Sequence, residues 1–449
     1  MRASSGASVG ACVRSRSGTP RRRPGRLMSY VTQEAHGPDE GPAGAPRVGR
    51  SAAPPAPRFR HDPLKGILPL RPDGGTTVRW DTEPVVCGHA ELLHHGDRDG
   101  AGIPVPVCAS PVAVPGVGTV VGSYDGRVRL YDRTLTKAYW HVRLGGPIYS
   151  SLVADRSRRR VVVATTSGEV ACVDLRGTVI WRTQTGAGIY ATPTLLPEAD
   201  LLVLTAFDSR CLGIDLATGT VRFARDLPRP WHAGIGSAAH RDAYASPATT
   251  ADGNAVVACA EYVLCLRPDG TETWRYEAGH TIKSSPVVLT GRDEVAVCPV
   301  DGRCLFLDSG SGVLRGVAEL GGKVVASPAA SGRFLVVGTQ DGTAHGIDAD
   351  RRSVVWSAPG YGPREYTSFT VLPDGGVTAV VSRGNAVGLR PEDGRFLWET
   401  SQVLGLADHD PAMDVTPVPA PDGSMYGGSY SGMLYHFRFR TAETAKERP

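Results

Sequence analysis

The sequence predicts an all-β protein: an eight-bladed β-propeller of four-stranded antiparallel blades, whose last blade is closed by the N-terminal strand. Three observations predict this fold. A short motif that begins with Ser or Thr recurs at the period of propeller blades. Turn residues separate short apolar runs, and a large aromatic residue ends most repeats.

The recurring phrase begins with a Ser or Thr, followed by Pro in six of eight repeats, and leads into an apolar run. The spacings between successive Ser/Thr anchors are 41, 41, 54, 39, 42, 41 and 48 residues. The anchors are Ser110, Ser151, Thr192, Ser246, Ser285, Ser327, Ser368 and Thr416. Such a period leaves room for four short strands per unit, as in propeller blades.

Tight turns lie between the apolar runs of these repeats. Gly and Asp tolerate the positive φ that tight hairpins require. The turns include Tyr124-Asp125-Gly126, Thr166-Ser167-Gly168, Asp301-Gly302, Asp341-Gly342 and Ser431-Gly432. Each repeat is therefore expected to contain antiparallel hairpins.

An aromatic residue, or a residue replacing it, stands near the end of each repeat. These positions are Trp140, Trp181, Phe223, Trp274, Gly316, Trp356 and Trp398. We expect the aromatic side chains to pack between blades. The eighth repeat has no such aromatic residue at its C-terminal end. Residues 70–80 are similar in sequence to residues 266–274, so we expect the N-terminal strand, ending at Trp80, to complete the last blade.

Composition indicates three segments: an Arg/Pro/Gly-rich disordered tail (1–62), one propeller domain (63–440) and a charged C-terminal tail (441–449). The first 60 residues hold eleven Arg against three carboxylates, an excess of eight in a chain of net charge +4. The remainder therefore carries about −4 and predicts no nucleic-acid partner. No apolar stretch is long enough for a membrane span, and we expect a cytoplasmic protein that starts at Met1 or Met28.

Two repeat units carry a resemblance to a known family. Gly122-Ser-Tyr-Asp-Gly126 through Trp140, and Asp215-Leu-Ala-Thr-Gly219 through Phe223, resemble the repeats of pyrroloquinoline-quinone-type (PQQ-like, BamB-like) propellers over roughly residues 66–438. This family includes quinoprotein dehydrogenases and non-catalytic assembly factors. The quinone itself is not expected, because the nine cysteines are isolated and the vicinal pair of such dehydrogenases is missing.

Long anchor spacings predict insertions where blades lead into their innermost strands. They place Trp231, His232 and His240 on one insertion, and His409 and Asp410 on another; His280 lies on a shorter loop of the same kind. A third insertion is expected over residues 81–107. Histidine exchanges protons near neutral pH and binds divalent metals, so His232, His240 and His409 are the candidate metal ligands, although none is assigned.

Strand alternation gives a second set of candidates. The residue two positions before an anchor faces the same way as the anchor, toward the central channel if the anchor does. This set includes Tyr149, Tyr190, Tyr244, Lys283, Tyr366 and Asp414. Tyr and Lys can donate protons or bind charged groups, so these residues are expected to ring the channel mouth.

The candidates favour a small-molecule-binding propeller, expected to be a non-redox enzyme of the lyase, cyclase or isomerase type in bacterial specialised metabolism. His232, His240, Lys283, Tyr244, Tyr366 and His409 would be catalytic, and Trp231, Tyr149, Tyr190, Asp410, Asp414 and His280 would bind ligand, with or without a divalent metal. A non-catalytic scaffold for a protein partner is the alternative, marked by the aberrant repeat at Gly316. A PQQ-dependent dehydrogenase is a third reading.

Overall fold

The computed structural model describes residues 76–94, 102–114, 116–228, 244–289, 291–364, 367–400 and 413–443. All of these belong to one compact unit, His61–Pro449. The predicted tail, residues 1–62, lies outside the described residues. No helix within the described part of the chain has the length and apolar character needed to cross a membrane.

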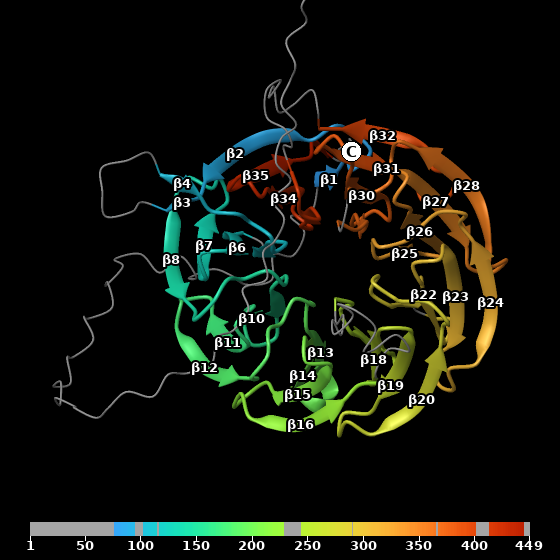
Figure 1. The fold of residues 1–449 in the computed structure, drawn as a ribbon. Helices are drawn as coiled ribbons and strands as arrows, with labels where there is room; N and C mark the ends of the chain where they lie inside the picture. Colours follow the sequence, from blue (N-terminus) through green and yellow to red (C-terminus); the bar gives the residue numbers. More distant parts are fainter. Residues whose placement is uncertain are drawn as a thin grey trace, which may run out of the picture. The chain divides into compact units, whose positions relative to one another are not determined.

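The described strands form eight four-stranded antiparallel blades arranged in a ring (Figure 1), which confirms the predicted eight-bladed propeller. Blade 1 is β5 (Val112–Val114), β6 (Gly118–Gly122), β7 (Arg127–Asp132) and β8 (Ala138–Arg143). Blade 2 is β9 (Val153–Asp155), β10 (Arg160–Ala164), β11 (Glu169–Asp174) and β12 (Val179–Gln184). Blade 3 is β13 (Thr194–Leu196), the short helix η1 (Pro197–Ala199), β14 (Leu201–Ala206), β15 (Arg210–Asp215) and β16 (Val221–Asp226). Blade 4 is β17 (Ala248–Thr249), β18 (Ala255–Cys259), β19 (Tyr262–Leu266) and β20 (Glu272–Glu277).

The second half of the ring repeats this plan. Blade 5 is β21 (Val287–Leu289), β22 (Glu294–Val297), β23 (Arg303–Asp308) and β24 (Leu314–Glu319). Blade 6 is β25 (Ala329–Ser331), β26 (Phe334–Gly338), β27 (Thr343–Asp348) and β28 (Ser353–Pro359). Blade 7 is β29 (Thr370–Val371), β30 (Val377–Val380), β31 (Ala386–Leu389) and β32 (Phe396–Glu399). Blade 8 is β33 (Val418–Pro419), β34 (Ser424–Gly428), β35 (Met433–Arg438) and the early strand β2 (Val85–Glu91).

Two small ladders flank the closing blade. β1 (Thr76–Val78) pairs with β36 (Thr441–Glu443), and β3 (Leu93–His94) pairs with β4 (Ile103–Pro104). The described pairing thus continues to Glu443, past the predicted domain end at residue 440. Residues 81–107, predicted as a loop insertion, instead supply the outermost blade strand β2 and this second ladder. That prediction was wrong because residues 85–91 alternate between exposed and partly buried positions and pair with β35 as a strand.

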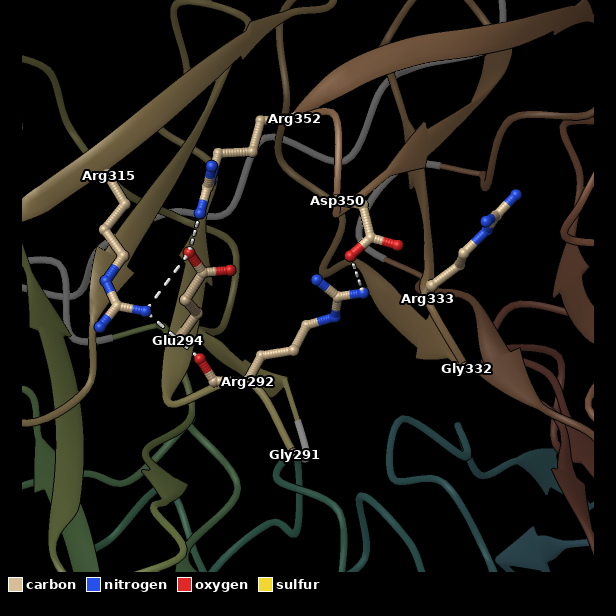
Figure 2. Close-up of a pocket in the computed structure, with 8 residues that line it drawn as sticks. All are labelled: Gly291, Arg292, Glu294, Arg315, Gly332, Arg333, Asp350 and Arg352. Carbon is tan, nitrogen blue, oxygen red and sulfur yellow. Dashed lines mark hydrogen bonds and ion pairs between the residues drawn. The ribbon is translucent and has the colours of Figure 1, made fainter.

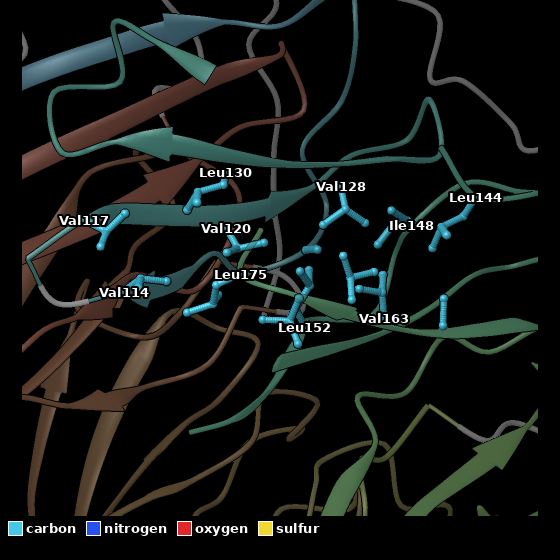
Figure 3. Packing of buried hydrophobic residues seen from close by; sticks show 14 residues of the cluster. Val114, Val117, Val120, Val128, Leu130, Leu144, Ile148, Leu152, Val163 and Leu175 are labelled. Carbon is cyan, nitrogen blue, oxygen red and sulfur yellow. The ribbon is translucent and has the colours of Figure 1, made fainter. Parts of the chain in front are cut away.

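The hydrophobic core lies between the blades. The second strands, such as β6 and β10, are apolar on both faces because each blade is covered by a neighbour on either side. Val120, Val128 and Leu130 of blade 1 pack in one cluster with Val163 and Leu175 of blade 2 (Figure 3). Packing between blades therefore supplies most of the apolar burial that stabilises the ring.

The Ser/Thr anchors link neighbouring blades directly. Among the described residues, seven backbone N–H groups of anchors donate to the anchor hydroxyl of the next blade over 2.9–3.1 Å. The series runs Ser110, Ser151, Thr192, Ser246, Ser285, Ser327, Ser368 and Thr416. These anchors lead into the innermost strands, so the hydrogen bonds tie the blades together around the channel.

The outer aromatic residues link the blades at the rim. Each of five Trp indoles donates to a backbone carbonyl in the next blade over 2.8–2.9 Å, as Trp140 does to Leu175. The ring of Trp140 also lies on Gly177, which has φ +84°, and a Cβ there would come within 2.9 Å of the indole. A large residue on one blade thus fits a left-handed glycine on the next.

Trp80 corrects the prediction for the eighth aromatic. In blade 1, Trp140 pairs with Leu130 next to a β-bulge. The equivalent position in blade 8 is Gly88, which pairs with His436 next to a bulge, so Gly88 and not Trp80 occupies the aromatic position. Trp80 lies before β2, is buried against Phe439 and accepts the indole hydrogen bond of Trp398 through its carbonyl. The closing strand is therefore β2, and the apparent match of residues 70–80 to residues 266–274 is out of register with it.

The interface between blades 5 and 6 reverses the usual arrangement. Gly316 occupies the aromatic position opposite Phe306, and Arg352, with φ +52°, lies where blades 2 to 5 and blade 7 have a left-handed glycine. A Cβ on Gly316 would collide with Cδ of Arg352, so the arginine stem fills the space of the missing aromatic. Its guanidinium binds Glu294 over 2.5 Å, and that carboxylate is only 2% exposed.

Removal of one anchor hydroxyl is expected to destabilise the ring. In Ser285→Ala, the partly buried N–H of Ser246 loses its acceptor, so the free energy of unfolding should fall by about 1 to 3 kcal/mol. Urea denaturation followed by far-ultraviolet circular dichroism measures the change. Ser382→Ala, at an exposed turn, is the control, and equal losses in the two variants would contradict a linking role for the anchors.

The closing blade should be sensitive to acid. His436 is 2% exposed and stacks on Tyr426, and its burial, aided by Arg133, lowers its pKa to about 4, against about 6.5 when unfolded. The folded state favours the neutral imidazole of His436. Its contribution to the free energy of unfolding is therefore complete above about pH 6.5, and up to about 3 kcal/mol is lost as the pH falls toward 4. Unfolding free energies of wild type and His436→Gln, measured from pH 7 to about 4, should therefore converge on acidification. The exposed His141→Gln control should keep the wild-type slope; a wild-type slope in His436→Gln would refute the assignment.

Candidate functional site

A cluster of aromatic side chains and one lysine lies where blades 2 to 5 lead into their innermost strands. Tyr149, Tyr190, Tyr244 and Lys283 each stand two residues before an anchor, and Phe207 lies in the turn between β14 and β15. We call these five residues the mouth cluster. The anchor hydrogen bonds fix the backbone beside four of them, so the ring geometry determines where these side chains begin.

The rings of the mouth cluster touch one another. Tyr190 stacks on Phe207 with centroids 4.0 Å apart and planes 19° apart. Tyr149 lies 5.4 Å from Tyr190, and Tyr244 meets Phe207 edge-to-face at 4.9 Å. The Lys283 ammonium lies 5.9 Å from the centroid of the Tyr244 ring, within cation–π range. The structure therefore brings together four aromatic rings and a cation, and Tyr244 remains 42% exposed.

Phe207 was not among the sequence-based candidates. Its backbone N–H donates to the carbonyl of Gly188, which holds the turn beside Tyr190. A signal for it exists in the repeat, because the equivalent turn residue is aromatic in blades 1 and 8 as well, at Tyr124 and Tyr430. The Gly and Asp of these turns predict a hairpin but say nothing of the aromatic residue that precedes them.

Asp414 occupies the equivalent position in blade 8 but is buried. It accepts a hydrogen bond from the N–H of Tyr430 over 2.7 Å and lies 3.4 Å from Nε of Arg364. Burial, together with the Asp414 charge, raises the pKa of the Cys108 thiol to about 12. Asp414 therefore holds the neighbouring turn in place, and the ligand-binding role predicted for it stays a prediction.

His280 lies on the loop between β20 and β21, exposed and 3.7 Å from Asp301. The other candidates lie outside the described residues: Trp231, His232, His240, Tyr366, His409 and Asp410. Within the described part of the chain, no three His, Cys, Asp or Glu side chains gather to hold a metal. The candidate metal ligands His232, His240 and His409 stay predictions.

Comparison with known proteins agrees with the repeat pattern. The family model of the outer membrane protein assembly factor BamB (PQQ_2) matches residues 124–260 and 259–448. The chain belongs to this family. This BamB-family propeller is similar in fold to BamB from Moraxella catarrhalis, with a TM-score of 0.61, 15% identity, and coverage of 79% of this chain and all of that one.

Other similarities are to proteins of different kinds. The computationally designed Ika8 protein aligns with a TM-score of 0.61 and 14% identity over 79% of this propeller and 99% of Ika8. Sqt1 of Saccharomyces cerevisiae aligns with a TM-score of 0.60 and 11% identity, over 80% of this chain and 99% of Sqt1. The beta-alanine-activating enzyme of Danio rerio is 30% identical over 105 residues, which are 21% of this chain and 9% of that enzyme. The first two similarities show a shared fold, and the last covers a small part of the enzyme it matches.

The described mouth residues do not fit pyrroloquinoline quinone, the cofactor in the family's name. The quinone is a tricarboxylate, but the mouth cluster contains one cation, Lys283, which is set against a Tyr ring. The eight described cysteines are free and none adjoins another in the sequence. No step of the proposed function therefore involves the quinone.

Proposed function

We propose that the mouth cluster binds a small planar molecule with an acidic group. The contact between four aromatic rings and a lysine carries this proposal. Flat apolar ligands stack on such rings, and an ammonium attracts a carboxylate or similar anion. A ligand that combines both features would match both parts of the cluster.

Non-redox acid–base chemistry is the reaction type we propose at this place. Tyr hydroxyls and a Lys ammonium donate protons to developing oxyanions, and the corresponding bases accept protons from carbon or oxygen. Lys283 and Tyr244 are the proposed proton-transfer pair, with Tyr149 and Tyr190 holding the ligand. A lyase, cyclase or isomerase reaction needs no further reactant from the protein. Tyr366, His240 and His409 would add acid–base groups, as the sequence predicts.

Trans-cinnamate and its uncharged analogue cinnamyl alcohol can test the binding proposal. The full-length protein should bind cinnamate more tightly, and Lys283→Gln should remove that preference by weakening cinnamate about ten-fold. Tyr190→Ala should weaken both compounds by about three- to ten-fold, because stacking is lost. Isothermal titration calorimetry measures all six affinities, of two compounds for three proteins.

The chain contains a matched control pair at the outer rim. Lys137 lies 5.7 Å from the ring of Tyr139 on β8, so its geometry resembles that of Lys283 and Tyr244. Lys137→Gln and Tyr139→Ala should leave cinnamate binding unchanged. Equal losses at the rim and at the mouth, or no saturable binding by wild type, would remove the proposal.

A metal-assisted variant of the chemistry can be tested separately. Elemental analysis of purified full-length protein and of His232→Ala should show a stoichiometric divalent metal in wild type that is lost in the variant. A wild-type protein free of metal leaves the Lys283 and Tyr244 pair to act alone. Trp231→Ala serves as the control for loop folding in this comparison.

A protein-interaction scaffold is the second candidate function. The family model is described as an assembly factor, which favours this role. In that case the mouth cluster would bind a side chain of a partner instead of a free molecule. Neither cinnamate nor cinnamyl alcohol would then bind with measurable affinity, which separates the two candidates.

A further inference from the structure

A polar pocket lies at the reversed interface between blades 5 and 6. Figure 2 shows it bounded by Glu294, Arg315 and Arg352 on one side and by Arg292 and Asp350 on the other. Its volume is about 570 Å³, within the range of small-molecule sites. It is built by the turns between first and second strands and between third and fourth strands, whereas the mouth cluster uses the other turns of the blades.

The exchange of Gly316 and Arg352 creates the inner wall of this pocket. An aromatic wedge would have made the interface apolar, but here the Arg352 guanidinium and the buried Glu294 meet between the blades. Arg315 also lies 3.8 Å from Glu294 and binds Asp308. Glu294 is thus held by two arginines and serves as a fixed structural anion.

The outer wall carries two arginines on equivalent turns. Gly291-Arg292 connects β21 to β22, and Gly332-Arg333 connects β25 to β26 in the next blade. Among the eight turns of this kind, only these two contain Gly followed by Arg in the sequence. The two blades that meet at the reversed interface therefore share a cationic turn.

Each of these two arginines forms an ion pair in which one of the two side chains is exposed. Arg292 binds Asp350 over 2.6 Å, but the Asp350 side chain is 54% exposed. Arg333 lies 3.6 Å from Asp348, and its own side chain is 55% exposed. The exposed Asp350 carboxylate can turn into solvent, so the Arg292 guanidinium can take up another anion at small cost. Asp348 is buried but keeps its hydrogen bonds from the backbone N–H groups of Asp350 and Arg351 if the exposed Arg333 side chain turns away.

The charge balance indicates the kind of ligand. The pocket is lined by four arginines and two carboxylates, which leaves a net charge of +2. Residues 61–449 as a whole carry a net charge of about −4, so this pocket differs in sign from the domain around it. Asp308 and Asp348 lie behind the lining and pair with Arg315 and Arg333, so the attraction for an anion depends on which arginines can take up a new partner. Arg292 and Arg333 are the two that can do so, which matches a ligand with two anionic groups.

We propose that the pocket binds a small molecule carrying two oxyanion groups, phosphate or carboxylate. Arg292 would bind one group as a bidentate partner in place of Asp350. Arg333, whose side chain points outward in Figure 2, would turn inward and bind the second group from the rim. Arg315 and Arg352 would add positive potential while Glu294 keeps them in position.

Pyrophosphate and citrate are the probes for this site. Titration calorimetry of the full-length protein in metal-free buffer at low ionic strength should show saturable binding with one site per chain. Arg292→Gln should raise the Kd about ten-fold or more, and Arg333→Gln should raise it by a smaller factor. Asp350→Asn should lower the Kd, because the competing carboxylate is removed. Preference for one probe identifies the oxyanion class.

Arg158→Gln is the matched control, since Arg158 lies on the corresponding turn of blade 2 and is likewise paired with carboxylates. It should leave the Kd unchanged, and circular dichroism should show that every variant is folded. Failure of both probes to bind, or equal weakening by Arg158→Gln, would overturn the proposal. Arg292-dependent binding of an Asp-rich hexapeptide without binding of either small anion would also overturn it, in favour of an acidic protein partner.

Discussion

The hydrogen bond from each anchor N–H to the next anchor hydroxyl is the constraint on which the rest of this propeller depends. The innermost strands contain only two or three residues, too few to hold a blade in place by sheet pairing alone. The anchor hydroxyl supplies an acceptor to the neighbouring blade and satisfies a peptide N–H that would otherwise lack a protein partner. Proline after most anchors fixes the following backbone and removes a competing donor.

The same constraint explains why the mouth cluster is ordered around one arc of the ring. Tyr149, Tyr190 and Tyr244 each stand two residues before an anchor. Because the anchors of successive blades are hydrogen-bonded to one another, the three Tyr rings lie in contact. At the rim, the indoles set a second spacing between blades. The reversed interface has Gly316 in place of the aromatic residue and Arg352, paired with Glu294, in place of the glycine.

The sequence predicts the fold well because the same pattern of anchor, apolar run and turn occurs eight times. The anchors, turns and most rim aromatics were assigned correctly from spacing alone. Trp80 was misplaced because its surroundings resemble a repeat end, while Gly88 carries no side chain to mark the true position. The role of Arg352 depends on contacts between blades, which the period of one blade cannot reveal. Phe207, in contrast, has a signal in the repeat, because Tyr124 and Tyr430 occupy the same turn position. Asp414 has the right offset for the mouth, but Arg364 and the Tyr430 amide draw it into the interior.

Closure by β2 has a consequence for the protein during its synthesis. More than 340 residues separate Glu91 from Met433, so β2 leaves the ribosome long before its partner β35 exists. At about 5 to 20 residues per second, this strand waits for tens of seconds without its ladder. An unpaired strand is prone to associate with other chains, but Gly88, His89 and Glu91 interrupt its apolar character. The absence of an aromatic residue at Gly88 thus lowers the risk of aggregation before the ring is complete.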